Sequence, residues 1–146
     1  MNRTISPHRG ADSAARRGTV ITMLFQSFED SDAWKIAHEF TLAVYRVSSH
    51  FPKAEVYGLT SQMRRSASSV PANLAEGMGR HSKREFLRYC RIANGSLHET
   101  KYFALLAKDL NYCEPNGYRE ITTLAKRVGA LIGGLERSLQ KQTATR

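Results

Sequence analysis

The chain has 146 residues, of which 41% are apolar, and 22 Lys and Arg against 13 Asp and Glu give a net charge of +9. This length suffices for one domain with a buried core, and no apolar run approaches the roughly 18 residues of a membrane span, so no membrane partner is predicted. The positive charge favours a polyanionic partner, although many basic proteins bind nothing specific.

The first 27 residues differ from the rest of the chain. They contain scattered Arg, Ser and Gly without periodicity, and they lack the apolar stretch of a secretion signal. We therefore predict a disordered basic N-terminal extension over residues 1–27. One hypothesis is that Met23 is the natural start and that residues 1–22 come from an over-extended reading frame. The alternative is a basic tail that contacts RNA.

A first helix is predicted over about residues 31–49. Ser31 or Asp32 can cap its start. Phe51 precedes Pro52, and a residue in that position is biased away from helix, which ends the element. Its apolar stripe follows a spacing of three and four residues: Trp34, Ala37, Thr41, Val44 and Ser48.

A second helix is predicted from residue 54 or 55 to Gly79. Pro71 inside it removes a hydrogen bond and costs on the order of 3 kcal/mol. We expect a kinked but continuous helix, because the stripes of the pattern keep their phase across Pro71, with nearby serines bonding the freed carbonyls. The alternative is a break at Pro71, which gives five helices. The expected serines are Ser66, Ser68 and Ser69.

Two further helices complete the prediction. Ser82 and Glu85 form a capping box that opens a helix ending near residues 110–112. Its expected core stripe includes Phe86, Tyr89 and Cys90. The last helix covers about residues 116–140, and residues 141–146 are predicted to be a disordered tail. The expected apolar stripe of this last helix consists of Ile121, Leu124, Val128, Leu131, Leu135 and Ser138.

These elements predict an all-α protein. Short connections favour antiparallel neighbours, so residues 28–140 are expected to form an antiparallel up-and-down four-helix bundle. The two cysteines, Cys90 and Cys113, have no CxxC spacing and suggest no disulfide framework. We therefore expect a cytoplasmic protein.

One long segment resembles a known family. The matching positions are FPKAEVYGLTSQMRRSASSVPANLAEG over residues 51–77, then Gly79-Arg80, then AxGSLxE from Ala93 to Glu99. They resemble the four-helix-bundle proteins encoded within 23S rRNA intervening sequences, a family similar to the accessory variability proteins of diversity-generating retroelements. The resemblance implies a bundle that assembles into a ring-like homo-oligomer, a homopentamer, with nucleic-acid association.

Basic residues concentrate where the second and third helices meet. Residues 63–91 carry seven basic and two acidic side chains, whereas residues 28–62 carry three and five. Arginine suits phosphate because its planar fork binds two oxygens at once. Few aromatic residues accompany these arginines, which favours backbone contacts over base recognition. The alternative is a solvated face that keeps the protein soluble. The predicted nucleic-acid-binding residues are Arg64, Arg80, Lys83, Arg84, Arg88 and Arg91.

A polar stripe on the second helix has a different interpretation. Arg65 and Glu76 lie about three turns apart, so each needs a partner from another helix or subunit. We hypothesise a buried or half-buried network that sets the register of helices and subunits. The alternative is a catalytic or ligand site. The residues of this polar stripe are Gln62, Arg65, Ser69, Asn73 and Glu76.

No pattern of catalytic or metal-binding residues stands out. The five histidines show neither HxxxH nor HExxH spacing, and Gly77-Met78-Gly79 lacks the lysine of a phosphate-binding loop. We therefore expect neither an enzyme nor a metal or other cofactor.

Two functions remain open. The first is a non-enzymatic oligomer that binds RNA or DNA backbones. The second is an oligomeric adaptor that docks an acidic protein, a reverse transcriptase or its ribonucleoprotein. Binding to naked RNA without a protein partner distinguishes them.

Overall fold

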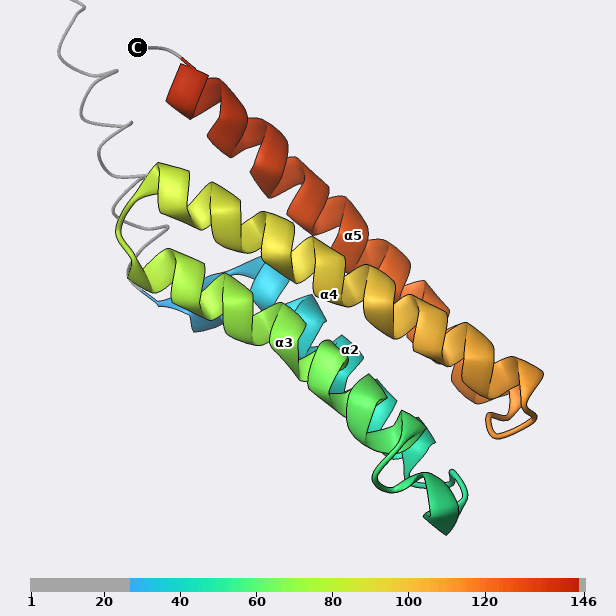
Figure 1. The fold of residues 1–146 in the computed structure, drawn as a ribbon. Helices are drawn as coiled ribbons and strands as arrows, with labels where there is room; N and C mark the ends of the chain where they lie inside the picture. The colour runs from blue at the N-terminus through green and yellow to red at the C-terminus, as the bar shows by residue number, and fades with distance from the viewer. Residues whose placement is uncertain (1–26, 145–146) are drawn as a thin grey trace, which may run out of the picture.

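The computed structural model describes residues 27–144, and these residues form helices and no strand. Four α-helices lie side by side as a bundle (Figure 1). The expected all-helical fold is confirmed; the predicted extension lies outside the described residues except for Ser27, which caps η1. The elements are η1 (Phe28–Asp30), α2 (Asp32–Ser48), η2 (Lys53–Glu55), α3 (Leu59–Gly79), α4 (Lys83–Asp109) and α5 (Pro115–Ala144).

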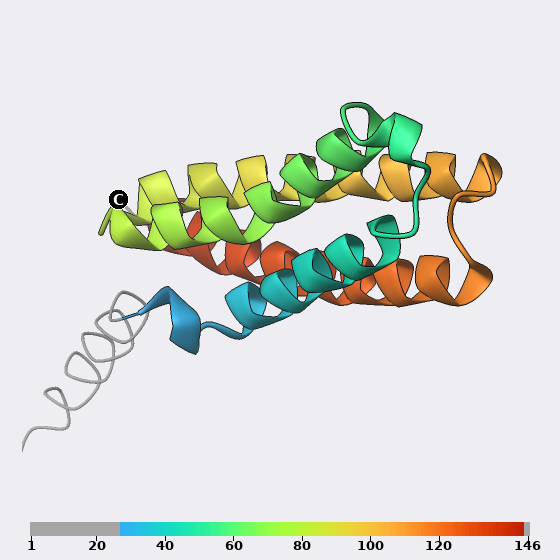
Figure 2. The same ribbon diagram turned by 90° about the horizontal axis from the view of Figure 1, so that it is seen from below.

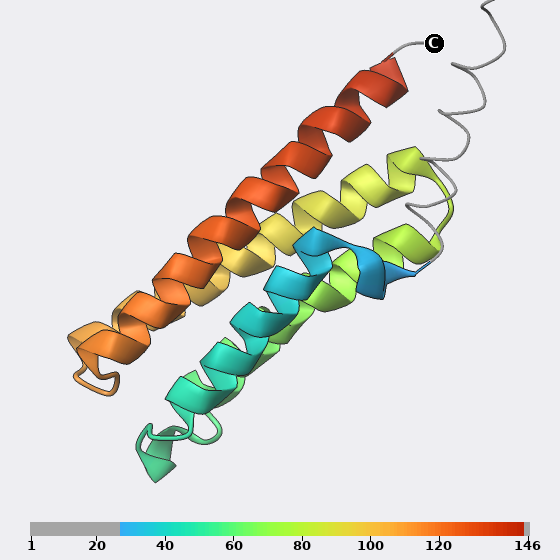
Figure 3. The ribbon, with the colours of Figure 1, turned by 180° about the vertical axis from the view of Figure 1, so that it is seen from behind.

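Each α-helix packs against two neighbours. The main contacts join α2 to α3, α3 to α4, α4 to α5 and α5 back to α2. Figures 2 and 3 show this arrangement from below and from behind. Along the α3–α4 contact, Ser69 meets Ser96 and Glu76 meets Tyr89, so residue numbers rise in one helix as they fall in the other.

Large apolar side chains from all four helices fill the centre of the bundle. The pattern in α5 differs from the prediction, since Ile132 is fully buried while Leu131 remains 36% exposed. The predicted stripe repeats every 3.5 residues, whereas the helix turns every 3.6 residues, so the buried positions shift along α5 relative to the prediction. For the same reason Ala125 is buried in place of Leu124. The largest fully buried residues are Phe40, Val44, Met63, Val70, Leu74, Phe86, Leu97, Ile121, Val128 and Ile132.

The start of α3 also differs from the prediction. The chain forms the short η2 and a turn, and α3 begins at Leu59 rather than at residue 54 or 55. The amide of Leu59 donates to the Glu55 carboxylate at 2.9 Å. A carboxylate at this position satisfies a terminal amide and suits the positive end of the helix dipole, so Glu55 caps α3 instead of lying inside it.

Helix α3 continues through Pro71, so the five-helix alternative is wrong. Proline has no amide hydrogen for the carbonyl four residues earlier, which belongs to Ala67. The hydroxyl of Thr41 on α2 lies 3.0 Å from that oxygen. The serines expected to compensate bond elsewhere: Ser66 donates to the carbonyl of Met63, Ser68 to that of Arg65, and Ser69 pairs with Ser96.

The start of α4 and the end of α5 agree with the prediction only in part. Ser82 accepts from the amide of Glu85 at 3.3 Å, which is half of the predicted capping box, whereas the Glu85 carboxylate contacts Arg88. Helix α5 extends to Ala144, so the predicted disordered tail is wrong for residues 141–144. Leu139 is buried in the common core and holds the last turns of α5 against the bundle.

Candidate nucleic-acid interface

The first turns of α4 carry four of the predicted nucleic-acid-binding residues, which we name the α4 row: Lys83, Arg84, Arg88 and Arg91. The opposite side of these turns packs Phe86 and Cys90 into the core, so Arg84, Arg88 and Arg91 face solvent. Arg84 and Arg91 form no ion pair with any carboxylate of residues 27–144, and neither does the half-buried Lys83. These cations are available to an external anion.

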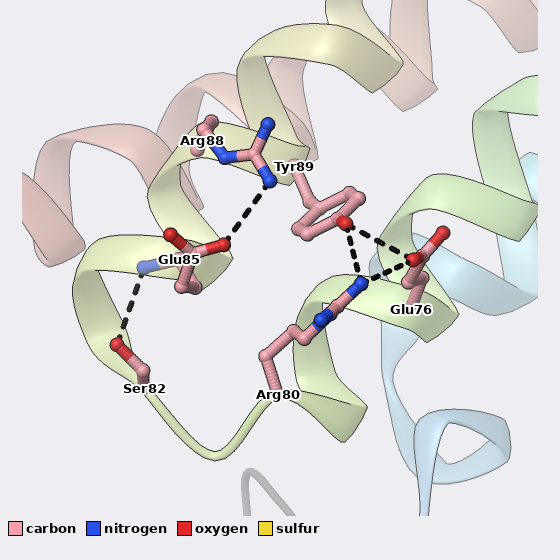
Figure 4. Close-up of polar contacts among 6 residues, drawn as sticks. All are labelled: Glu76, Arg80, Ser82, Glu85, Arg88 and Tyr89. Atoms are coloured by element: carbon pink, nitrogen blue, oxygen red, sulfur yellow. Dashed lines mark hydrogen bonds and ion pairs between the residues drawn. The ribbon is translucent and has the colours of Figure 1, made fainter.

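Arg88 in the middle of the row has a partner of its own (Figure 4). Its guanidinium lies 3.2 Å from a Glu85 carboxylate oxygen and 4.8 Å from the centre of the Tyr89 ring. The hydrogen bond with Glu85 is the main reason that the pKa of Arg88 is raised. The side chain remains 58% exposed, so an incoming phosphate competes only with a surface ion pair.

Arg80 is held inside a three-residue cluster (Figure 4). Its guanidinium donates to Glu76 at 2.8 Å and to the Tyr89 oxygen at 3.0 Å, and the Tyr89 hydroxyl donates to the same Glu76 oxygen at 3.0 Å. The hydrogen bond from Arg80, followed by that from Tyr89, lowers the pKa of Glu76. Arg80 therefore joins the end of α3 to the start of α4, and its predicted phosphate contact would compete with these bonds.

Arg64 lies far from the other predicted contacts. It precedes Arg80, the residue that follows α3, by 16 residues, which corresponds to about 24 Å along the helix. Its guanidinium donates to Ser48 at 2.8 Å and to the carbonyl of Tyr45 at 3.3 Å, and it covers the Tyr45 ring. Arg64 thus ties α3 to α2, because its long side chain reaches back across their contact, and it is not part of the α4 row.

The predicted polar stripe of α3 lies along the edge of the α3–α4 contact. Arg65 pairs with Glu99 at 3.8 Å, Ser69 with Ser96 at 3.0 Å, and Asn73 donates to Ser69 at 2.8 Å. Arg65 and Glu76 therefore do have partners on another helix. The network is not buried in the single chain, however, since Gln62, Arg65 and Glu76 are exposed and only Ser69 and Asn73 are half-buried. Helix α4 covers only one side of the stripe.

Charge is divided unequally between the two halves of the described chain. Residues 27–82 hold six basic and six acidic side chains and are neutral, whereas residues 83–144 hold eleven and six, a net charge of +5. Sequence reasoning compared shorter consecutive segments and missed this division. The charges can be counted in the sequence, but only the pairing of α4 with α5 brings them together on one half of the bundle.

Other chemistry has little support among the described residues. No group of three His, Cys, Asp or Glu is placed to hold a metal ion between residues 27 and 144. None of the described helices is both long and apolar enough to cross a bilayer. Burial raises the pKa of Cys90 to about 12, which keeps this thiol protonated and unreactive at neutral pH.

The fold and the surface together define an all-helical protein with one neutral and one basic half. The chain belongs to the 23S rRNA-intervening sequence protein family, whose sequence profile matches residues 29–134. Its fold is similar to the crystal structure of a protein of unknown function from the S23 ribosomal protein family of Bacteroides thetaiotaomicron VPI-5482. That comparison has a TM-score of 0.66 at 20% identity and covers 71% of this chain and 97% of the other. No protein with a curated description matches the chain.

Proposed function

We propose that this protein is a non-enzymatic, cytoplasmic, nucleic-acid-binding oligomer that contacts phosphate backbones through the start of α4. The observation that carries the proposal is the row of Lys83, Arg84, Arg88 and Arg91, in which three of four cations have no carboxylate partner within residues 27–144. Cations on successive turns suit a polyanion, because each phosphate contact releases counterions.

The proposal includes assembly into a ring, in which copies of the row form one basic surface. The opposed contact order of neighbouring helices supports an antiparallel, up-and-down bundle as its subunit. Exposed Leu42 and Tyr45 on α2, in the neutral half, offer apolar surface for contacts between subunits. A homopentamer has a mass of about 82 kDa, five times the 16.4 kDa chain. Light scattering after size exclusion tests this, and a monomer would overturn it.

The binding test is a titration of the protein into labelled structured RNA and a matched DNA duplex across a salt series. Four contacts per subunit give log affinity a slope of about −3 to −4 against log salt. Arg84→Glu with Arg88→Glu lowers the net charge from +9 to +5 and is expected to remove most of the binding. The matched control is Lys35→Glu with Lys53→Glu, which makes the same change of charge at exposed sites in the neutral half. Wild-type protein that binds neither probe at low salt would overturn the proposal.

A second function is favoured by apolar side chains at the opposite end of the bundle. Tyr57 is 95% exposed and Val56 is 52% exposed in the turn before α3, and Leu110 at the end of α4 is 45% exposed. Such residues suit a protein partner. The second proposal is therefore an adaptor that docks a reverse transcriptase or its ribonucleoprotein, as the resemblance to retroelement accessory proteins implies. Binding of such a partner, lost in Tyr57→Ser, together with no affinity for naked RNA would favour it.

A further inference from the structure

The α4–α5 contact has a register that can be read from two pairs. A Cβ atom at Gly129 would lie 3.5 Å from Leu97, and the ammonium of Lys108 lies 5.0 Å from the centre of the Tyr118 ring. Glu136 is also near enough to Cys90 to act on it electrostatically. The residue numbers of each pair add to 226. This constant sum fixes which turns of α4 and α5 lie at the same level along the whole contact.

The register brings cations of the two helices to common levels. Lys108 lies level with Tyr118 and its neighbour Arg119, and Lys101 lies level with Ala125 and its neighbour Lys126. Lys101 follows Leu97 by four residues and precedes Lys108 by seven, so it shares their α5-facing side of α4. Lys126 precedes Gly129 by three residues and therefore shares its α4-facing side. The two cationic levels are separated by about 10 Å.

A fifth cation extends the series along α5. The Arg137 guanidinium folds back along its own helix, 3.3 Å from a Cβ atom placed at Gly133. Gly133 is level with Ala93, whose neighbour Asn94 belongs to the same side of α4 as Lys101. All five cations are exposed. We name these residues the α4–α5 basic ridge: Lys101, Lys108, Arg119, Lys126 and Arg137.

The acidic residues of this half do not neutralise the ridge. Glu99 pairs with Arg65 on α3 and Glu120 pairs with Arg46 on α2, so two carboxylates serve the neutral half of the bundle. Glu85 pairs with Arg88, and one oxygen of Glu136 is buried without a hydrogen-bond partner in the described chain. Asp109 and Glu114 lie at the connection beyond the ridge. No ridge residue forms an ion pair with a carboxylate of residues 27–144.

Like charges at the same level repel each other, and the bundle does not compensate for them internally. We propose that the α4–α5 basic ridge is a track for one nucleic-acid strand, whose phosphates lie between the cations of α4 and those of α5. This inference rests on the proposed function and adds contact surface along the bundle, beyond the four residues at the start of α4. From Lys108 to the level of Arg137 the ridge extends about 28 Å, or roughly eight nucleotides of a stacked strand.

The test compares three double variants that share a net charge of +5. Lys101→Glu with Lys126→Glu changes the ridge, Arg84→Glu with Arg88→Glu changes the α4 row, and Lys35→Glu with Lys53→Glu is the control. At about 0.1 M salt the ridge variant is expected to bind RNA at least tenfold more weakly than the wild type and to reduce the salt slope by about 2. The control is expected to remain within threefold. Circular dichroism verifies folding, and the neutral pair Lys101→Gln with Lys126→Gln replaces a ridge variant that fails to fold.

Lysine acetylation followed by mass spectrometry gives a second readout that reports position. Bound RNA is expected to protect Lys101, Lys108 and Lys126, and to leave Lys35 and Lys53 accessible. A ridge variant that binds like the control, with unprotected ridge lysines, would overturn the inference. If the α4-row variant still loses binding in that case, the proposed function survives without the ridge. A wild-type protein that binds no RNA would instead overturn both the proposed function and the inference about the ridge.

Discussion

The hydroxyl oxygen of Thr41 lies 3.0 Å from the carbonyl oxygen of Ala67, across the contact between α2 and α3. Ala67 lies four residues before Pro71 and cannot receive the usual helical amide hydrogen. The same hydroxyl lies 2.9 Å from the carbonyl of Ala37 on its own helix. One proton therefore serves two buried acceptors, and α2 supplies the donor that the sequence of α3 lacks.

Thr41→Val is expected to destabilise the protein by about 1–3 kcal/mol, because a nearly isosteric apolar side chain leaves the Ala67 carbonyl buried without a donor. Urea unfolding followed by circular dichroism measures this loss. The matched control is Thr123→Val on the exposed side of α5, which should change the free energy of unfolding by less than about 0.5 kcal/mol.

Pro71→Ala tests the reason for that loss. Alanine restores an amide hydrogen for the Ala67 carbonyl, so Thr41→Val should cost about 1 kcal/mol less in the Pro71→Ala background than in the wild type. A double-mutant cycle measures this coupling. Additive effects of the two substitutions would show that Thr41 does not replace the missing amide.

Gly77→Ala is expected to cost about 1–3 kcal/mol, because its Cβ atom would lie 2.7 Å from Tyr89 and 2.9 Å from Phe86. Gly95→Ala is the matched control on α4, where a Cβ atom meets nothing within 4 Å. The Gly95→Ala exchange should stabilise the protein by about 0.5–1 kcal/mol, because alanine has a higher helix propensity than glycine. Thermal unfolding of both variants gives the comparison, and equal shifts would contradict the close approach of α3 and α4 at Gly77.

Glu76→Gln should reduce stability in a pH-dependent way. The folded-state pKa of Glu76 lies below its ordinary value of 4.5, chiefly because of Arg80, so the carboxylate contributes stability above pH 4.5. This contribution is lost as the pH falls through the folded-state pKa. The difference between wild type and variant in urea unfolding is therefore expected at pH 7 and should vanish in more acidic solution. Glu39→Gln is the control, since this exposed residue forms no ion pair within residues 27–144. A pH-independent difference for Glu76→Gln would contradict the mechanism.

The two thiols should react with iodoacetamide at different rates at pH 8. Burial raises the pKa of Cys90 to about 12 and also raises that of Cys113, which is only half-buried. Mass spectrometry of the native protein should find Cys113 alkylated first, with Cys90 modified only after unfolding. Rapid modification of native Cys90 would show that the core opens around it.

Local signals in the sequence predicted the helices well. Ser31 and Ser82 cap helices as expected because each contacts an amide within three residues. The start of α3 was misplaced because the Glu55 carboxylate competes with the helix for the Leu59 amide. Such competition depends on the turn and leaves no periodic signal.

The surface was harder to predict than the fold. Arg80 and Arg64 belong to the basic segment in the sequence, but their partners Tyr89 and Ser48 lie on neighbouring helices. The α4–α5 basic ridge was missed for the same reason, since Lys101 and Lys126 come to one level only when the two helices pair in register. Charge summed along a sequence does not distinguish paired from unpaired cations.

The division into a neutral α2–α3 half and a positive α4–α5 half gives the described part of the molecule an electric dipole across the bundle, transverse to its helices (Figure 1). In the field of a polyanion such a molecule experiences a torque that turns α4 and α5 toward the negative charge before contact. At physiological ionic strength the field extends only about 8 Å, so this rotation occurs during the last stage of approach. Salt then acts on the rate of productive encounter as well as on the lifetime of the complex.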